Sequence, residues 1–343
     1  MEHDVEQNEE LTNLPVKKTY NRVINVLLII IIFSALFIIV LKNRDRLDEY
    51  KETLLNMSYV NILIILVATI LANILRSWRW YYLLLPIKKT ISFVIVFRVS
   101  ISALVANFTM PGKLGVPVKA IFLKKEEKIE MSKSLPSILG EIFIEHSTEL
   151  LLAAICVLIG GHLTKFYQVV QQLLTDQNAV LNIAIMFGLF AIMVLVISMF
   201  RKKIRSVHFF EKFWGAFAES TRRFDYLFYS YLITLINMII SYYVFWFLIK
   251  TLGHPEIDLT FIIFAGAITN FMGLISPFPG GIGVREITIY GLYDFYYELG
   301  GIAFLAIIIM RIITYVSLFL SFLMERALTG MMASQKHSVS SIF

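Results

Sequence analysis

Long apolar runs separated by short polar segments dominate the chain. Several runs approach or exceed the roughly 18–20 residues with which a helix crosses a lipid bilayer. The pattern therefore predicts an all-α, polytopic helical membrane protein with about six full transmembrane helices. The predicted spans are Val23–Leu41, Tyr59–Leu75, Ser137–Ile159, Val180–Phe200, Tyr226–Ile249 and Ile302–Met324.

Two further apolar runs end in segments rich in proline and glycine. Ile91–Met110 leads into Pro111–Lys119, and Phe261–Ser276 leads into Pro277–Glu286, which Ile287–Leu299 follows. Both breaks read P-G-x-(Leu/Ile)-G-V, with a basic residue shortly after. Because every backbone N–H and C=O in lipid needs a partner, such breaks are typical of discontinuous helices packed inside protein or lining a wet cavity. We therefore predict two re-entrant broken-helix segments.

Composition supports a membrane protein without a separate soluble domain. The chain is 58% hydrophobic, has a mean hydropathy of +0.74 and is only 16% charged, against about 25% in soluble domains. The net charge of +6 does not indicate nucleic-acid binding, because the Lys and Arg residues gather in loops. A single cysteine, Cys156, excludes an intramolecular disulfide.

The distribution of basic residues favours one topology over another. If both breaks are re-entrant and the N-terminal tail, 1–22, is cytoplasmic, most of the 31 Lys and Arg residues face the cytoplasm. If every apolar run crosses fully, fewer do so. The first arrangement makes the breaks enter from opposite sides, as in an inverted repeat. It predicts a multi-pass protein of the plasma or inner membrane, with a transmembrane domain at 23–326 and a C-terminal tail at 327–343.

The second break has the chemistry of an anion site. Its glycines can adopt positive φ and expose successive N–H groups, which form an anion-binding nest; these are Gly280, Gly281 and Gly283. A helix beginning near Arg285 would add its positive end, and the guanidinium suits phosphate. In the first break, Pro117 fits the first turn of a helix and Lys119 supplies the charge. The alternative is that both breaks are structural kinks.

Acidic residues recur every fourth position in the span after the first break, so they share one helical face; they are Glu141, Glu145 and Glu149. We expect them to pair with the intramembrane arginines Arg98, Arg285 and Arg311, or to line water. They are interpreted either as a structural ion-pair network or as a proton- or headgroup-coupled pathway. Glu286 could pair with its neighbour Arg285 or carry a proton.

No pattern of metal ligands or catalytic motif accompanies these residues. His146 stands beside Glu145 without a second His or Cys at ligand spacing. Nucleophile, zinc-protease and phosphate-loop signatures are not found. We therefore predict neither a metal nor a cofactor.

The second break, P-x-P-G-G-I-G-V-R-E, resembles the most distinctive motif of the lysylphosphatidylglycerol synthase transmembrane-region family, also called flippase-like proteins. Arg76–Leu84 is similar to its Arg-x-x-Arg-Trp segment, Asn107–Lys119 to its first break, and Glu145–Glu149 to its E-R-x-x-D helix. Arg311 resembles a late helix arginine. The chain departs from the family pattern by placing Val116 for Glu, Lys119 for Arg, His146 for Arg and Glu149 for Asp.

The resemblance implies a role in moving or handling lipids with anionic or glycosylated headgroups, so the expected partners are membrane lipids. Family members with a soluble aminoacyl-transferase domain synthesise lipid, and this chain shows no such domain. The leading hypothesis is a flippase-like lipid transporter. The alternatives are a membrane transferase acting on a lipid-linked substrate and a non-catalytic subunit that partners a lipid-synthesising enzyme.

Overall fold

The computed structural model describes residues 47–109, 115–161, 224–276 and 278–340, together with positions 37, 39–41, 44, 167 and 171. For 331–340 it describes the helical backbone alone. Most of the predicted span Val23–Leu41, all of Val180–Phe200, residues 111–114 of the first break and Pro277 lie outside this description.

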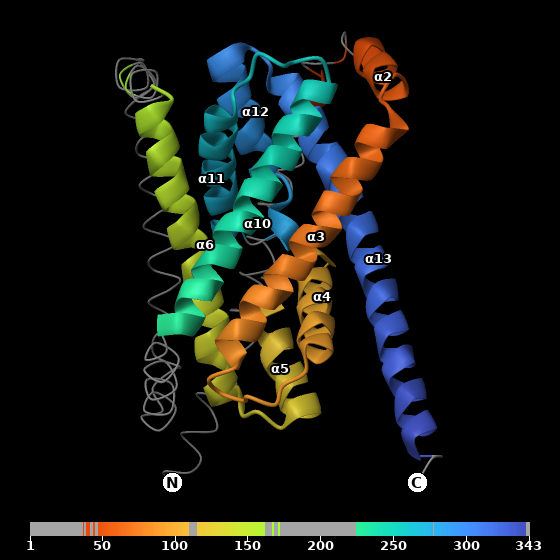
Figure 1. Cartoon of the computed structure of the whole chain (residues 1–343). Helices are drawn as coiled ribbons and strands as arrows, with labels where there is room; N and C mark the ends of the chain where they lie inside the picture. Colours follow the sequence, from red (N-terminus) through yellow and green to blue (C-terminus); the bar gives the residue numbers. More distant parts are fainter. Residues whose placement is uncertain are drawn as a thin grey trace, which may run out of the picture.

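Within the described residues the secondary structure is entirely helical (Figure 1). Four helices are long and apolar enough to cross a membrane: α3 (Tyr59–Leu84), α6 (Met131–Ile159), α10 (Phe224–Thr251) and α13 (Gly300–Ser340). They confirm four of the predicted spans. A short helix, α2 (Leu47–Leu55), precedes α3.

Three of these helices extend beyond the predicted spans. α3 continues past the predicted end at Leu75 through the arginine- and tryptophan-rich segment Arg76–Leu84. α6 begins at Met131 and includes Pro136. α13 runs into the predicted C-terminal tail as far as Ser340. Hydropathy alone therefore underestimates helix length wherever polar residues continue the helix.

Two helical hairpins lie between the long helices. The first pairs α4 (Phe93–Thr109) with α5 (Gly115–Glu127), and the second pairs α11 (Leu259–Ile275) with α12 (Val284–Tyr297). Helices of 13 and 14 residues, such as α5 and α12, rise only about 20 Å and cannot cross a hydrocarbon core of about 30 Å. Figure 1 shows the two hairpins entering the bundle from opposite ends, as the re-entrant interpretation predicts.

The order span–hairpin–span therefore occurs twice, as α3–α4–α5–α6 and as α10–α11–α12–α13. Equivalent helices make equivalent contacts: α6 packs on α11 as α13 packs on α4, and α3 on α13 as α10 on α6. α3 and α10 pack directly against each other and run in opposite directions (Figure 1). This is the arrangement of an inverted repeat.

In each hairpin a side chain accepts a hydrogen bond from a backbone N–H at a helix start. Across the first, the N–H of Gly115 donates to the Asn107 carboxamide oxygen at 2.8 Å, and Pro117 occupies the first turn of α5, as predicted. The second hairpin starts with Asp258 accepting from the N–H of Phe261 at 2.7 Å. Gly280, in the short 3₁₀ turn η2 (Pro279–Gly281), has a φ of 57° that favours glycine.

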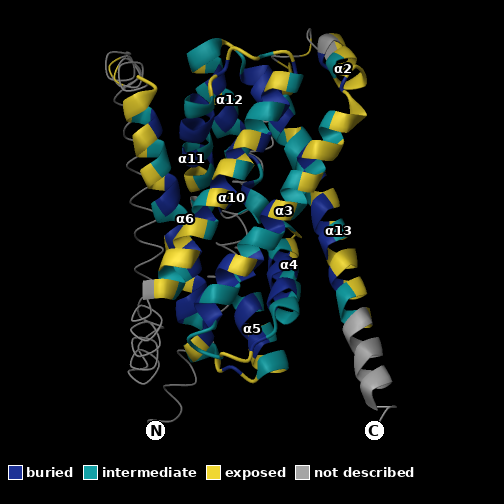
Figure 2. Ribbon diagram, viewed as in Figure 1, coloured by how far each residue is buried: buried dark blue, intermediate teal, exposed yellow. Residues whose placement is uncertain are grey.

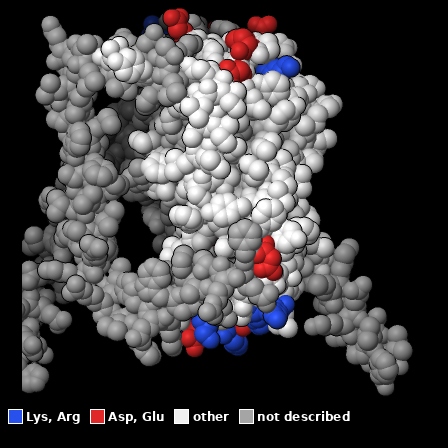
Figure 3. Space-filling model, turned by 60° about the vertical axis from the view of Figure 1, so that its left-hand side comes forward, with Lys and Arg blue, Asp and Glu red and all other residues white. Residues whose placement is uncertain are grey.

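The outer surface is apolar between two charged ends. Large hydrophobic side chains are exposed along the long helices, among them Val60, Leu63 and Val67 on α3. Figure 2 shows buried positions concentrated where helices meet, and Figure 3 shows charged groups at the two ends of the face it presents. Because lipid tails are as apolar as these side chains, the belt is the surface expected to face a bilayer.

Candidate functional site

Two neighbouring cavities lie at the centre of the bundle. The first, of about 290 Å³, is enclosed by α3, α6, α10, α11, α12 and α13. The second, of about 250 Å³, lies toward the first hairpin and is lined by α3–α6, α11, η2 and Arg285 of α12. Residues that line both cavities form the boundary between them; the charged or titratable ones are Arg76, Arg79, Glu145, His146 and Arg285.

Arg79 organises the acidic face of α6. Its Nη2 donates to Glu141 Oε1 at 2.8 Å and to Glu145 Oε2 at 2.7 Å. The residue is 2% exposed, although it lies beyond Leu75, the predicted end of the span. α3 remains helical past it, because its charge is neutralised by carboxylates on α6 rather than by water or lipid phosphate. Arg79 is a site residue that the sequence analysis missed.

Lys119 completes this network and does not face a free anion. Its Nζ forms an ion pair with Glu141 Oε2 and lies 4.2 Å from the centre of the Trp80 ring. The predicted role of Lys119 on a lipid phosphate therefore does not fit the structure, since its charge is already paired and its side chain is mostly buried.

Arg98 is not a partner of the α6 glutamates, which corrects the predicted pairing. It lies near the start of α4, where its Nε donates to Glu325 Oε1 at 2.7 Å and its Nη2 to Thr329 Oγ1 at 2.9 Å. Glu126 of α5 lies 3.4 Å from its Nη1. Arg98 thus joins α4 and α5 to the C-terminal half of α13, outside both cavities.

Arg311 likewise pairs with a residue other than the α6 glutamates. Its Nε forms an ion pair with Glu286 Oε1, and Glu286 Oε2 accepts the N–H of Gly283 at 2.7 Å. Adjacent residues on a helix point about 100° apart, so Glu286 cannot follow Arg285 into the cavity. The carboxylate caps α12 instead of neutralising the neighbouring arginine.

The glycines of the second break adopt the predicted backbone but leave little of the predicted nest open. Gly280, Gly281 and Gly283 have φ values of 57°, 71° and 82°. However, the N–H of Gly281 donates to the Phe278 carbonyl at 3.0 Å, and that of Gly283 binds Glu286. The anion held at this helix start is the protein's own carboxylate. A Cβ on Gly281 would lie 3.2 Å from Arg285 Cδ, so this glycine gives the arginine room.

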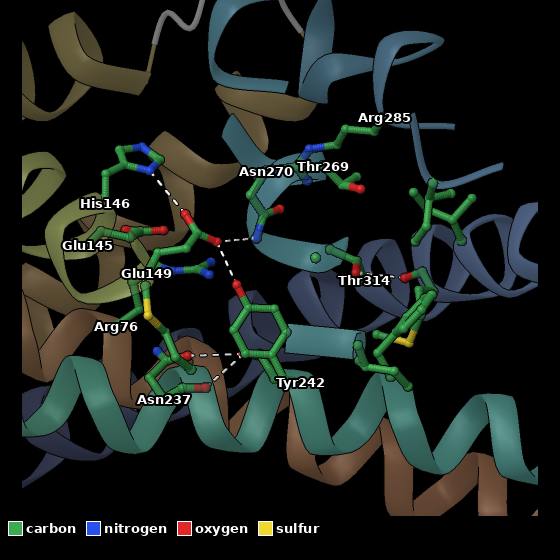
Figure 4. Close-up of a pocket in the computed structure, with 18 of the residues that line it drawn as sticks. Arg76, Glu145, His146, Glu149, Asn237, Tyr242, Thr269, Asn270, Arg285 and Thr314 are labelled. Carbon is green, nitrogen blue, oxygen red and sulfur yellow. Dashed lines mark hydrogen bonds and ion pairs between the residues drawn. The ribbon is translucent and has the colours of Figure 1, made fainter. Parts of the chain in front are cut away.

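Arg285 has no partner of its own in the described structure. Its guanidinium makes no hydrogen bond or ion pair with any described residue, and its Nε is fully buried and unsatisfied. The side chain passes so closely over Gly273 of α11 that a Cβ there would overlap Nε and lie 2.9 Å from Cγ. Arg285 lines both cavities (Figure 4).

Glu149, on the same cavity wall, is held by a different set of groups from its neighbours. Its Oε1 accepts from the Tyr242 hydroxyl at 2.7 Å and from Asn270 Nδ2 at 2.6 Å, while Oε2 lies 3.1 Å from His146 Nδ1 (Figure 4). Of the two alternatives predicted for Glu149, pairing with an arginine is not found, since no Lys or Arg nitrogen of the described chain lies within 4.0 Å of it; the residue lines the first cavity instead.

Besides Arg79, the sequence analysis missed four further residues of the site. Arg76 lies one turn before Arg79, lines both cavities and makes no hydrogen bond or ion pair with described residues. Tyr242, Asn270 and Gly273 come from apolar helices. The amide of Asn270 within the apolar sequence of α11 could have indicated a site residue, because unpaired polar groups are costly in lipid. Among the described residues, no cluster of His, Cys, Asp and Glu could hold a metal ion.

Comparison with known proteins adds one finding. The family model described as "Lysylphosphatidylglycerol synthase TM region" matches residues 24–321, which cover both hairpins and both cavities. No curated protein matches the chain.

Proposed function

The chain belongs to the lysylphosphatidylglycerol synthase transmembrane-region family, and we propose that it is a flippase-like transporter that binds the anionic or glycosylated headgroup of a membrane lipid between its two hairpins. The family relates it to lipid modification and handling. The specific activity proposed rests on the geometry of Arg285 and its surroundings.

The unpartnered guanidinium of Arg285 carries the proposal. A buried cation without a partner is costly, and proteins retain one where a ligand supplies the counter-charge. Arg285 offers a planar fork of donors that matches phosphate oxygens. It faces two cavities that together open toward both hairpins, which is the position a headgroup would occupy during transfer between leaflets.

The numbers of positive and negative side chains at the site support an anionic ligand. The described cationic groups at the two cavities and their direct partners exceed the carboxylates by one. The cations are Arg76, Arg79, Lys119, Arg285 and Arg311, and the carboxylates are Glu141, Glu145, Glu149 and Glu286. A phosphodiester headgroup, with its single negative charge, would neutralise the site.

The proposed orientation follows from the loops. The loops and adjoining helix ends at the end where the first hairpin enters carry a cluster of lysines: Lys88, Lys89, Lys124, Lys125, Lys128 and Lys133. The connection from α10 to α11, at the other end, carries Lys250 together with Glu256 and Asp258. The positive-inside rule places the lysine-rich end in the cytoplasm. The first hairpin then enters from the cytoplasm and the second from outside.

Reconstitution into vesicles tests the proposal. Wild-type protein in vesicles that contain fluorescent phosphatidylglycerol should make inner-leaflet lipid accessible to a membrane-impermeant quencher. Arg285→Gln should slow this at least about tenfold, because a charge-assisted hydrogen bond contributes about 1.5–3 kcal/mol. Lys89→Gln removes one positive charge from an exposed position outside both cavities and should match wild type. Equal rates for Arg285→Gln and wild type would exclude the proposed role.

A further inference from the structure

We propose that binding of an anionic headgroup at Arg285 is coupled to uptake of one proton by the Glu149–His146 pair, so that the lipid is moved together with a proton. This inference rests on the proposed function and names the second ligand of the same site. Its basis is the environment of Glu149, which differs from that of every other buried glutamate described in the bundle.

The other buried glutamates of the described chain have permanent cations as partners. Glu141 contacts Arg79 and Lys119, and Glu286 contacts Arg311. Glu325 contacts Arg98. In each of these pairs, protonation of the carboxylate would leave a Lys or Arg without its bonded counter-charge.

Glu149 is 4% exposed and is bound by Tyr242 and Asn270, which are neutral donors. Its one contact among the described residues that can carry a positive charge is His146, and histidine is the side chain whose ordinary pKa lies nearest neutrality. The pair can therefore gain or lose a proton without breaking a bond to a fixed cation. Tyr242 and Asn270 can also donate to the carbonyl oxygen of a protonated carboxyl group.

Charged groups surround this pair from each helix packed around the cavities. α3 supplies Arg76 and Arg79, and α5 supplies Lys119. α6 itself adds Glu141 and Glu145; α12 adds Arg285 and Glu286, and α13 adds Arg311. α10 contributes Tyr242, and the described residues of α11 that line the cavities are uncharged. Of these cations, Arg76 and Arg285 alone have no carboxylate bonded to them in the described structure.

Arg285 is repelled by Arg311 and attracted by Glu149, Glu286 and Glu145. An empty site therefore stabilises the ionised form of Glu149 through the positive charge of Arg285. A phosphate bound to Arg285 cancels that field in a cavity of low dielectric. The carboxylate becomes more costly, and proton uptake by Glu149 or His146 offsets the change. By linkage, protonation must strengthen headgroup binding by the same factor.

The location of His146 allows the proton to reach both sides. Its side chain lines both cavities, whereas Glu149 lines the first alone. An edge-to-face contact with Phe271 of α11, with ring centres 6.3 Å apart, keeps the imidazole at that boundary. A proton accepted from one cavity can therefore be released to the other as the hairpins rearrange.

Titration calorimetry on the full chain in nanodiscs tests the inference, with dihexanoyl-phosphatidylglycerol as the probe. Repeating each titration in buffers of different ionisation enthalpy gives the number of protons taken up. For wild type we expect uptake of up to one proton and a Kd that falls about three- to tenfold per pH unit of acidification, tenfold being the limit for one fully coupled proton. Glu149→Gln should bind with a Kd independent of pH and without proton uptake.

His146→Gln provides a second variant if Glu149→Gln does not fold, and it should reduce the pH dependence at least threefold. Lipid binding by wild type without proton uptake, at a Kd constant from pH 5.5 to 8.5, would overturn the coupling and leave the proposed headgroup site intact. Proton uptake that persists in both variants would place the proton elsewhere and also overturn it. An absence of phosphatidylglycerol binding to wild type would refute the headgroup site itself, and the coupling with it.

Discussion

Replacing Arg79 with methionine should be among the most destabilising single substitutions in the bundle. One nitrogen of this side chain bonds to both Glu141 and Glu145. Its loss leaves two carboxylates facing the single ammonium of Lys119. Breaking a buried ion pair by removing one partner costs about 3–5 kcal/mol. That is a large share of a total stability of about 5–15 kcal/mol.

Two double variants separate the effect of the lost positive charge from the effect of the lost packing. In Arg79→Met/Glu145→Gln the surplus carboxylate is gone and the pair of Lys119 with Glu141 stays intact. We expect this double variant to recover about half of the loss. Arg79→Met/Glu141→Gln should recover less, because Lys119 then loses the carboxylate bonded to it. The contacts predict which of the two double variants has the higher unfolding free energy, whatever the exact size of each contribution.

Equilibrium unfolding in mixed micelles of dodecylmaltoside and sodium dodecyl sulfate measures these differences. Lys89→Met is the matched control, since Lys89 is exposed and its substitution should change the unfolding free energy by less than about 0.5 kcal/mol. If Arg79→Met unfolds like the control, or if neither double variant is more stable than the single one, then the ion-pair network does not support the bundle as described.

Two further predictions concern the second hairpin. Gly273→Ala should weaken headgroup binding by about tenfold while the protein stays folded. The added methyl group displaces Arg285 and thereby removes a charge-assisted hydrogen bond of about 1.5–3 kcal/mol. Gly291→Ala is the control: its new Cβ meets nothing within 4 Å, so this variant should bind like wild type in the same calorimetric titration. Asp258→Ala should lower the unfolding free energy by about 1 kcal/mol through loss of the N-cap of α11, whereas Asp258→Asn should keep most of it; equal losses in the two variants would refute the capping role.

The arrangement of spans and breaks was predictable because lipid imposes strong rules on the backbone. A run of about 20 apolar residues has few alternatives to a helix, and a Pro/Gly-rich break requires cover from protein or water. The breaks around Gly115 and Gly283 therefore predicted the two hairpins. The opposite entry of the hairpins also followed from the distribution of lysines and arginines.

The pairing of charges was not predictable, since it depends on tertiary contacts. Arg79 meets Glu141 across 62 positions of sequence. Nothing in the local pattern distinguishes it from Arg98, which pairs with Glu325 at the far end of the chain. Helix geometry could have excluded one expectation, since Arg285 and Glu286 are adjacent and must point to different neighbours.

Comparison of the two hairpins explains why a single arginine, Arg285, makes the proposed site suited to an anion. In the first half, α5 contributes a cation, Lys119, to a carboxylate of the following span; in the second, α12 contributes a carboxylate, Glu286, to the cation Arg311. When Gly115 is aligned with Gly283, the two charged positions are one residue apart, and the two ion pairs have reversed polarity.

A further difference between the hairpins lies at the position of Arg285. When the glycines that begin the two helices are aligned, Arg285 of α12 corresponds to Pro117 of α5. The second hairpin therefore has a charged group for the headgroup, and the first has a residue without charge or N–H donor. On the proposed mechanism, the headgroup stays bound to the second hairpin while the first hairpin moves past it. A pseudo-symmetric fold would thereby obtain one anion site at its centre instead of two competing ones.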